Sequence, residues 1–203
     1  MSQKHIIVIG SGIIGSSIAW HLAKAQIAVT VIEAGDTGGL ATRNSWAWIN
    51  ASWGNPESYF RLRERSMLEW RTMDREVPGL AVKWCGGLIW DLEPAALEAY
   101  AKEHASWGYG IRRVSRDEIL RIEPNVKQVP DFAYHVAEEG MIEPLAAARA
   151  MLAGAVSLGA RVHHPARQFQ PDSDFVGASV IDPFGNVLGF MHNPHYLEMV
   201  GGR

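Results

Sequence analysis

The residues with the clearest chemical potential form a glycine-rich run near the N-terminus, Gly10-Ser11-Gly12-Ile13-Ile14-Gly15. In such a run the first glycine permits a tight turn, the second lets the backbone approach a pyrophosphate, and the third allows close helix-to-strand packing. The phosphates would lie at a helix N-terminus, where unpaired N–H groups and the helix dipole favour negative charge. Glu33, about 20 residues further on, could accept hydrogen bonds from ribose hydroxyls, and its charge disfavours NADP.

The segments around this run predict the βαβ unit that must position it. Residues 5–9 are a continuous β-branched run, which is typical of a strand covered on both faces. Residues 16–25 predict a helix whose apolar face carries Ile14, Ile18 and Leu22, and residues 27–32 predict a second strand. Strand, glycine run, helix, strand and acidic residue follow in order, so we predict a dinucleotide-binding unit. This unit alone leaves FAD and NAD open, and a glycine-rich turn without a ligand is the alternative.

Composition narrows the class of protein. The 203 residues contain 19 basic and 22 acidic side chains, with a net charge of −3, so no nucleic-acid partner is predicted. Apolar residues make up 47% of the chain, enough for one core and an appendage. The lone Cys85 fits a reducing compartment, and we expect it to be a buried small hydrophobe. No segment approaches the roughly 20 apolar residues of a membrane span.

The N-terminus also has features of a secretion signal. Lys4 precedes an apolar stretch, and Ala23-Lys24-Ala25 imitates a signal-peptidase site. The glycines interrupt that stretch, and a second strand follows where a βαβ unit requires it. We therefore predict a cytoplasmic protein.

The residues after the second strand resemble a known family. Ile32-Glu33-Ala34 is followed by Gly38-Gly39-Leu40-Ala41-Thr42-Arg43-Asn44-Ser45. Over about residues 4–165 the chain resembles the D-amino-acid oxidase-like family, which includes glycine oxidase, sarcosine oxidase and D-amino-acid dehydrogenases. In that family a small-residue, Asn-containing loop follows the ribose-binding Glu and passes over the flavin. The resemblance implies FAD rather than NAD.

The resemblance also implies which residues bind the cofactor. They are Gly10, Ser11, Gly12, Ile13, Ile14, Gly15, Glu33, Ala34, Thr42, Arg43, Asn44 and Ser45. Some relatives attach flavin through a histidine in this loop, but no histidine occurs between residues 22 and 103, so we expect non-covalent FAD. Arg43 has the alternative of a plain surface charge. Trp46, Trp48 and Trp53 either border the ring or belong to the core.

The same resemblance implies the reaction. A hydride would pass from the Cα–H of a small amine or amino acid to flavin N5, giving an imine that hydrolyses. The catalytic residues of relatives lie mostly beyond the part resembled here, so no catalytic residue is assigned. After Val162 the family would continue with more strands and most of the substrate domain, which we do not find in the sequence.

The middle of the chain predicts alternating helices and strands. Asn55-Pro56-Glu57 starts a long amphipathic helix, whose buried face is expected to carry Tyr59, Leu62, Trp70, Met73 and Val77. Residues 82–92, interrupted by Gly86-Gly87, predict a strand pair or a bulged strand.

Later signals continue this alternation. Pro94 opens a helix, and Ser115 with Glu118 forms a capping box. Residues 132–142 are strand-like, a helix follows from Pro144 to Gly159, and residues 160–162 begin another strand.

The last forty residues resemble something else. Residues 176–181 and 187–191 predict two strands joined by a turn at 183–186, similar to the last hairpin of the glyoxalase and bleomycin-resistance family. The join lies near residues 165–171. Gly189 stands where metal-binding members of that family have a Glu. His192, His195 and Glu198 have ligand-like spacing, but Pro194 breaks the helix they would need, so no metal site is predicted.

Together these features predict an α/β fold: an incomplete Rossmann-like FAD-binding domain, part of an α+β substrate domain and a short β-hairpin tail. The expected domains are residues 1–165 and 166–203. The expected function is FAD-dependent oxidation of the C–N bond of a small amine or amino acid. The alternative is a truncated, catalytically inactive adenine-nucleotide or FAD-binding remnant fused to a glyoxalase-like tail. A metal-dependent lyase or resistance protein is a third hypothesis, drawn from the tail alone.

Overall fold

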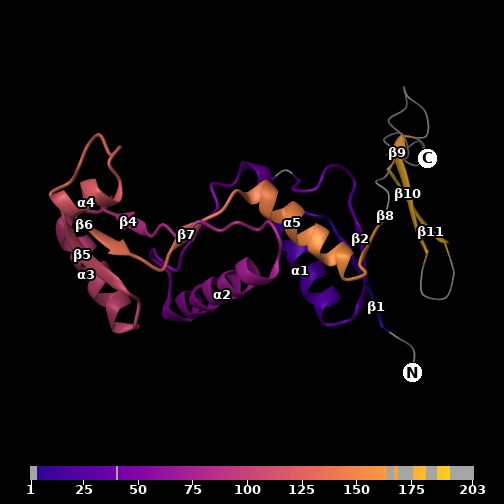
Figure 1. Cartoon of the computed structure of the whole chain (residues 1–203), viewed down its shortest axis with the longest axis horizontal. Helices are drawn as coiled ribbons and strands as arrows, with labels where there is room; N and C mark the ends of the chain where they lie inside the picture. The colour runs from indigo at the N-terminus through magenta and orange to yellow at the C-terminus, as the bar shows by residue number, and fades with distance from the viewer. Residues whose placement is uncertain (1–3, 40, 164–166, 169–175, 182–186, 193–203) are drawn as a thin grey trace, which may run out of the picture. The chain divides into compact units, whose positions relative to one another are not determined.

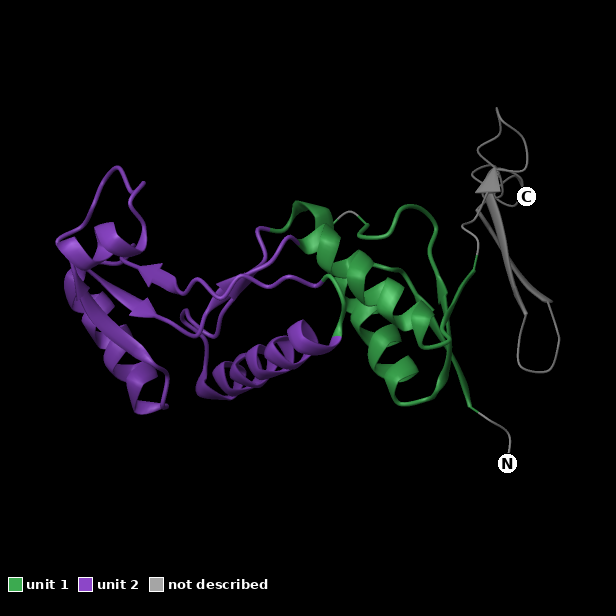
Figure 2. Ribbon diagram, viewed as in Figure 1, with its two compact units in different colours: residues 1–45, 77–79, 144–203 green, residues 46–76, 80–143 purple. Residues whose placement is uncertain are grey.

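The computed structural model describes residues 4–39 and 41–163, together with the backbone of residues 167–168, 176–181 and 187–192. Two units emerge from the chain's own contacts (Figure 2). Unit 1 contains residues 1–45, 77–79 and 144–203, and unit 2 contains residues 46–76 and 80–143. The chain therefore leaves unit 1 after the predicted flavin loop, touches it again at residues 77–79, and returns to it at residue 144.

Unit 1 is built on a parallel sheet. Its strands are β1 (His5–Ile9), β2 (Ala28–Ile32) and β8 (Arg161–His163), in the order β1-β2-β8. Helix α1 (Ile13–Lys24) connects β1 to β2, so the predicted βαβ unit is confirmed. The strand predicted from residue 160 is also confirmed, and it pairs with β2.

Helix α1 packs against α5 (Pro144–Ser157), and the two helices lie side by side in Figure 1. Small side chains permit this approach, since a Cβ on Gly154 would lie 3.1 Å from the indole of Trp20. The buried residues of α1 are Ser16, Ala19, Trp20 and Ala23. The predicted apolar face was therefore wrong: Ile14 and Ile18 are exposed, because the face that carries Trp20 and three small residues packs on α5.

The expectation that β1 is covered on both faces was also wrong. Val8 is buried, but Ile7 is 40% exposed and Ile9 is 80% exposed. Strand β1 pairs with β2 along one edge, and no other described strand lies along its second edge. The burial of β1 alternates along the strand, because residues 5, 7 and 9 share one face and that face is uncovered.

The C-terminal strands form a separate antiparallel sheet in the order β11-β10-β9. Strands β10 (Val176–Ile181) and β11 (Val187–His192) pair as predicted. Strand β9 (Arg167–Gln168), which pairs with the start of β10, was not predicted. The predicted turn at residues 183–186 lies outside the described residues, as do His195 and Glu198.

Unit 2 contains two small antiparallel sheets. One has the order β4-β6-β5, from Gly87–Ile89, Phe132–Val136 and Ile111–Ser115. The other pairs β3 (Trp48–Ile49) with β7 (Gly140–Met141). Of the strand pair or bulged strand predicted over residues 82–92, one strand formed, β4, which begins at Gly87. Before it, Lys83 pairs with Met141 only as an isolated bridge.

Three helices complete unit 2: α2 (Glu57–Glu76), α3 (Pro94–Ser106) and α4 (Arg116–Ile122). The capping box at the start of α4 is confirmed, with the Ser115 hydroxyl accepting from the Glu118 amide. Helix α2 is confirmed, but its predicted buried face is confirmed only in part. Met73 and Val77 are buried as predicted, whereas Tyr59 and Leu62 are exposed. Phe60 and Met67, which were not predicted, are buried as well. Among the helices in the described ranges, none combines the length and apolarity that a bilayer crossing requires.

A buried histidine in α3 gives a first testable prediction. His104 is 1% exposed, its Nδ1 contacts the Tyr100 carbonyl at 3.0 Å, and its Nε2 has no partner among the described residues. Burial lowers the pKa of His104, and it also lowers the pKa of His135. Below the ordinary pKa of about 6.5 the unfolded chain therefore takes up protons that the folded chain does not.

We expect the free energy of unfolding to fall as the pH is lowered from 6.5 through the depressed folded-state pKa values. His104→Phe should reduce this slope without abolishing it, because His135 still contributes. Urea unfolding at several pH values measures the slope, and a variant slope equal to that of the parent chain would contradict the assignment.

Candidate functional site

The turn from β1 into α1 depends on two glycines. Gly10 has φ of +91°, a left-handed conformation that favours glycine, and its amide donates to the Ile32 carbonyl at 2.7 Å. A Cβ on Gly15 would lie 2.0 Å from the carbonyl oxygen of Gly10. The first turn of α1 therefore sits directly against the end of β1, and only glycine fits at position 15.

This turn leaves hydrogen-bond donors available. The amides of Gly12, Ile14 and Gly15 have no acceptor among the described residues. A Cβ on Gly12 would meet only the Thr42 hydroxyl, at 3.1 Å. That hydroxyl also accepts from the Ile13 amide at 3.0 Å, so the loop after β2 caps the start of α1. Unpaired amides at a helix N-terminus attract a phosphate.

Glu33 lies just after β2, and its carboxylate is held by the glycine run. Its Oε2 accepts from the Ser11 amide at 2.6 Å and from the Ser11 hydroxyl at 2.7 Å, while Oε1 accepts from the Gly35 amide at 3.0 Å. Partial burial opposes the charged form, but these hydrogen bonds outweigh it, and the pKa of Glu33 lies below its usual value. A carboxylate has about four acceptor sites, and a ribose hydroxyl would share them with these local donors.

Ser11 and Glu33 were both predicted as cofactor-binding residues, but the contact between them was not predicted. Ser11 is completely buried, and its carbonyl accepts from the Gly38 amide at 3.1 Å. One serine therefore connects the glycine run with both the acidic residue and the loop that follows. A serine between two glycines is the only local signal in the sequence for this contact.

A hollow of about 720 Å³ runs along β1 and the first turn of α1. It brings together seven of the predicted residues, namely Gly10, Gly12, Ile13, Ile14, Gly15, Thr42 and Ser45. Thr42 belongs to a short 3₁₀ turn, Thr42–Asn44. The hollow is not lined by Ser11, Glu33, Ala34, Arg43 or Asn44. Arg43 is exposed, as its alternative interpretation as a surface charge requires.

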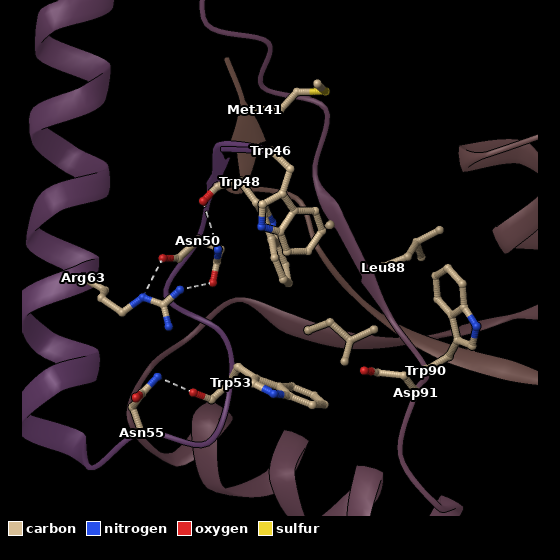
Figure 3. A pocket seen from close by; sticks show the side chains of 12 residues that line it. Trp46, Trp48, Asn50, Trp53, Asn55, Arg63, Leu88, Trp90, Asp91 and Met141 are labelled. Atoms are coloured by element: carbon tan, nitrogen blue, oxygen red, sulfur yellow. Dashed lines mark hydrogen bonds between the residues drawn. The ribbon is translucent and has the colours of Figure 1, made fainter. Parts of the chain in front are cut away.

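Unit 2 contains a second hollow, of about 760 Å³, that was not predicted as a site (Figure 3). Its lining includes four tryptophans, Trp46, Trp48, Trp53 and Trp90. Trp46 is 80% exposed, so it does not serve as core. Closely spaced tryptophans after the predicted flavin loop were the only sequence signal for this hollow.

Sequence comparison assigns the chain to a family. The sequence model of the FAD dependent oxidoreductase family (DAO) matches residues 5–182. The chain belongs to this family. The matched range contains the whole glycine run, Glu33 and the loop at 42–45, and it extends past the expected domain boundary at residue 165. The likeness of the tail to a glyoxalase hairpin stays a prediction.

Individual relatives agree with this family. Glycine oxidase of Bacillus licheniformis is 31% identical over 164 residues, covering 77% of this chain and 44% of the relative. The structure of L-amino acid deaminase from Proteus vulgaris superimposes with a TM-score of 0.72 at 19% identity, covering 89% of this chain and 44% of the other. Glycine oxidase from Bacillus cereus ATCC 14579 gives a TM-score of 0.70 at 20% identity, covering 92% and 52%. The chain thus spans about half the length of these relatives.

The residues predicted to bind FAD in unit 1 provide the groups that a diphosphate and a ribose need. A diphosphate needs amides without acceptors and space free of side chains, and both occur between Gly10 and Gly15. A ribose needs a charged acceptor close by, which Glu33 provides. The local geometry therefore fits an adenine dinucleotide, and membership of the family identifies that dinucleotide as FAD.

Two further observations concern reactive side chains. Cys85 is exposed, so the expectation of a buried small hydrophobe was wrong: it lies outside the strands, beside the turn at Gly86. Within the described part of the chain, no group of three His, Cys, Asp or Glu side chains is arranged to hold a metal ion.

Proposed function

We propose that this chain takes part in FAD-dependent oxidation of the C–N bond of a small amine or amino acid. The observation that carries the proposal is the glycine turn of unit 1, with its acceptor-free amides and the carboxylate held by Ser11. Bound FAD would supply the hydride acceptor. Two relatives are called glycine oxidase and one L-amino acid deaminase, which supports an amine or amino-acid substrate.

In this proposal the chain's own residues bind and orient the adenine half of the cofactor. The amides of Gly12, Ile14 and Gly15 donate to the diphosphate, and Glu33 accepts from the ribose. The absence of histidine between residues 22 and 103 supports non-covalent attachment. We also propose a cytoplasmic location, which the exposed thiol of Cys85 favours because such thiols persist in reducing compartments.

Glu33→Gln tests this assignment. Glutamine keeps the size of the side chain but removes the charge, so we expect FAD affinity to fall about tenfold, as for the loss of a hydrogen bond to a charged group. Asp36→Asn is the matched control, because Asp36 is an exposed acid of the same loop whose side chain makes no hydrogen bond or ion pair with another described residue. Titration by flavin fluorescence measures both variants, with circular dichroism to verify folding. Equal affinities for the two variants would remove Glu33 from the site.

A second candidate function is binding of FAD or an adenine nucleotide without turnover. The exposed Ile7 and Ile9 and the hollow along β1 favour it, because parallel sheets are normally covered on both faces. The two functions separate when purified chain is mixed with FAD and glycine under anaerobic conditions. Bleaching of the flavin absorbance supports oxidation, whereas saturable binding without bleaching supports the second function.

A further inference from the structure

The hollow in unit 2 is lined by tryptophan side chains that are not buried in the core of that unit. Trp46 is 80% exposed, and Trp53 and Trp90 are each 38% exposed. Figure 3 shows these indoles around one space, with Trp48 beside Trp46. Large apolar side chains gathered on one concave surface indicate a binding site rather than packing.

The indoles are held in place before any ligand arrives. Trp48 donates from Nε1 to the buried Glu139 at 2.9 Å, and the rings of Trp46 and Trp48 meet edge to face with centroids 5.6 Å apart. The backbone of Trp53 has φ of 85°, which is unusual for a bulky residue, and its amide donates to the Tyr100 hydroxyl at 2.9 Å. Such backbone strain persists where the surroundings enforce it, often at ligand sites.

Two charged side chains line the hollow, Asp91 and Arg63, and only Asp91 has no partner among the described residues. Asp91 is exposed, lines the hollow, and has no hydrogen bond or ion pair with any other described residue. Arg63 also lines it, but its guanidinium donates to the carbonyls of Asn50 and Ser52 at 3.1 and 2.5 Å and to the Asn50 side chain. Figure 3 places Arg63 on one side of Trp46 and Trp53, and Asp91 on their other side, next to Trp90. The available charge on the Asp91 side is negative.

We propose that this hollow binds an organic cation, an ammonium group that carries methyl or other alkyl substituents. Indole faces attract a cation through their quadrupole, and an alkylated ammonium loses less hydration than a bare one when it enters an apolar space. Asp91 supplies the opposite charge at the rim. Binding here needs no flavin, whereas identifying the cation as the amine that is oxidised rests on the proposed function.

Choline tests the proposal on the full chain without FAD. Its neutral isostere 3,3-dimethylbutan-1-ol has the same shape with carbon in place of nitrogen. We expect a saturable upfield shift of the choline methyl protons in NMR, as aromatic ring currents produce, and at least about fivefold weaker binding of the neutral alcohol. Equal binding of the two probes, or no saturable shift with choline, would overturn the proposal. Loss of FAD binding in Glu33→Gln with choline binding intact would separate this site from the flavin site.

Two variants locate the binding in the hollow. Asp91→Asn should weaken choline binding several-fold while binding of the alcohol stays unchanged, and Trp53→Leu should weaken both. The matched controls are Asp131→Asn and Trp70→Leu, which change residues of unit 2 that do not line the hollow. If a control variant matches the loss of its partner, or if Asp91→Asn leaves choline affinity unchanged, the assignment is wrong.

Discussion

Replacing Gly15 by alanine is expected to lower the free energy of unfolding by about 3 kcal/mol, at the upper end of overpacking substitutions. The added Cβ would lie 2.0 Å from the Gly10 carbonyl oxygen and 3.0 Å from its carbon. Both atoms belong to the backbone, so no side chain can move aside. Helix α1 must shift away from β1, which also displaces the amides proposed to bind phosphate. Urea unfolding followed by circular dichroism measures the loss, and FAD affinity should fall in parallel.

Gly35→Ala is the matched control for this prediction. Gly35 follows the same β2 strand, but a Cβ there would meet no atom within 4 Å, and its φ is not in the left-handed range. We expect the control to change stability by no more than about 0.5 kcal/mol. Similar losses in the two variants would show that close packing at Gly15 does not stabilise unit 1.

The nucleotide turn could be predicted because its determinants are local. The left-handed φ of Gly10 and the contact of Gly15 arise within six residues, and the spacing of the glycines reports them directly. The capping box at Ser115 is local in the same way. The strands at 176–181 and 187–192 followed from short apolar runs on either side of a turn signal.

Features of the fold that depend on contacts between residues far apart in the sequence could not be predicted. Ile14 and Ile18 form an apolar stripe on α1, yet the stripe with Trp20 and Ala23 is buried instead. Helix α5, more than a hundred residues later, packs on that stripe. The contact of Ser11 with Glu33 spans two strands. Gly86-Gly87 suggested a strand irregularity, but a Cβ on Gly87 would lie 2.0 Å from the Glu139 carboxylate, so this glycine makes room for a buried acid.

That buried acid carries the second large prediction. Glu139 is completely buried and accepts from the hydroxyls of Ser52 and Tyr109 and from Trp48 Nε1. Glu139→Ala would remove the carboxylate from all three donors and leave the Tyr109 hydroxyl only the weak Met67 sulfur acceptor. We expect the free energy of unfolding to fall by about 3 to 5 kcal/mol, as when one partner of a buried charged network is removed. Because Trp48 would lose its anchor, choline binding at the tryptophan hollow should weaken as well.

The pH dependence expected from Glu139 has the opposite sign to that expected from His104 and His135. Burial raises the pKa of Glu139 above 4.5, although its three donors and Arg63 oppose the shift. Between 4.5 and the raised pKa the folded chain keeps a proton that the unfolded chain releases, so stability falls as the pH rises through that window. Glu139→Gln should remove this contribution, whereas Glu138→Gln, at the exposed neighbouring position, should retain it. Urea unfolding across the acidic range measures both variants, and a slope that survives in Glu139→Gln would assign the titration to another group.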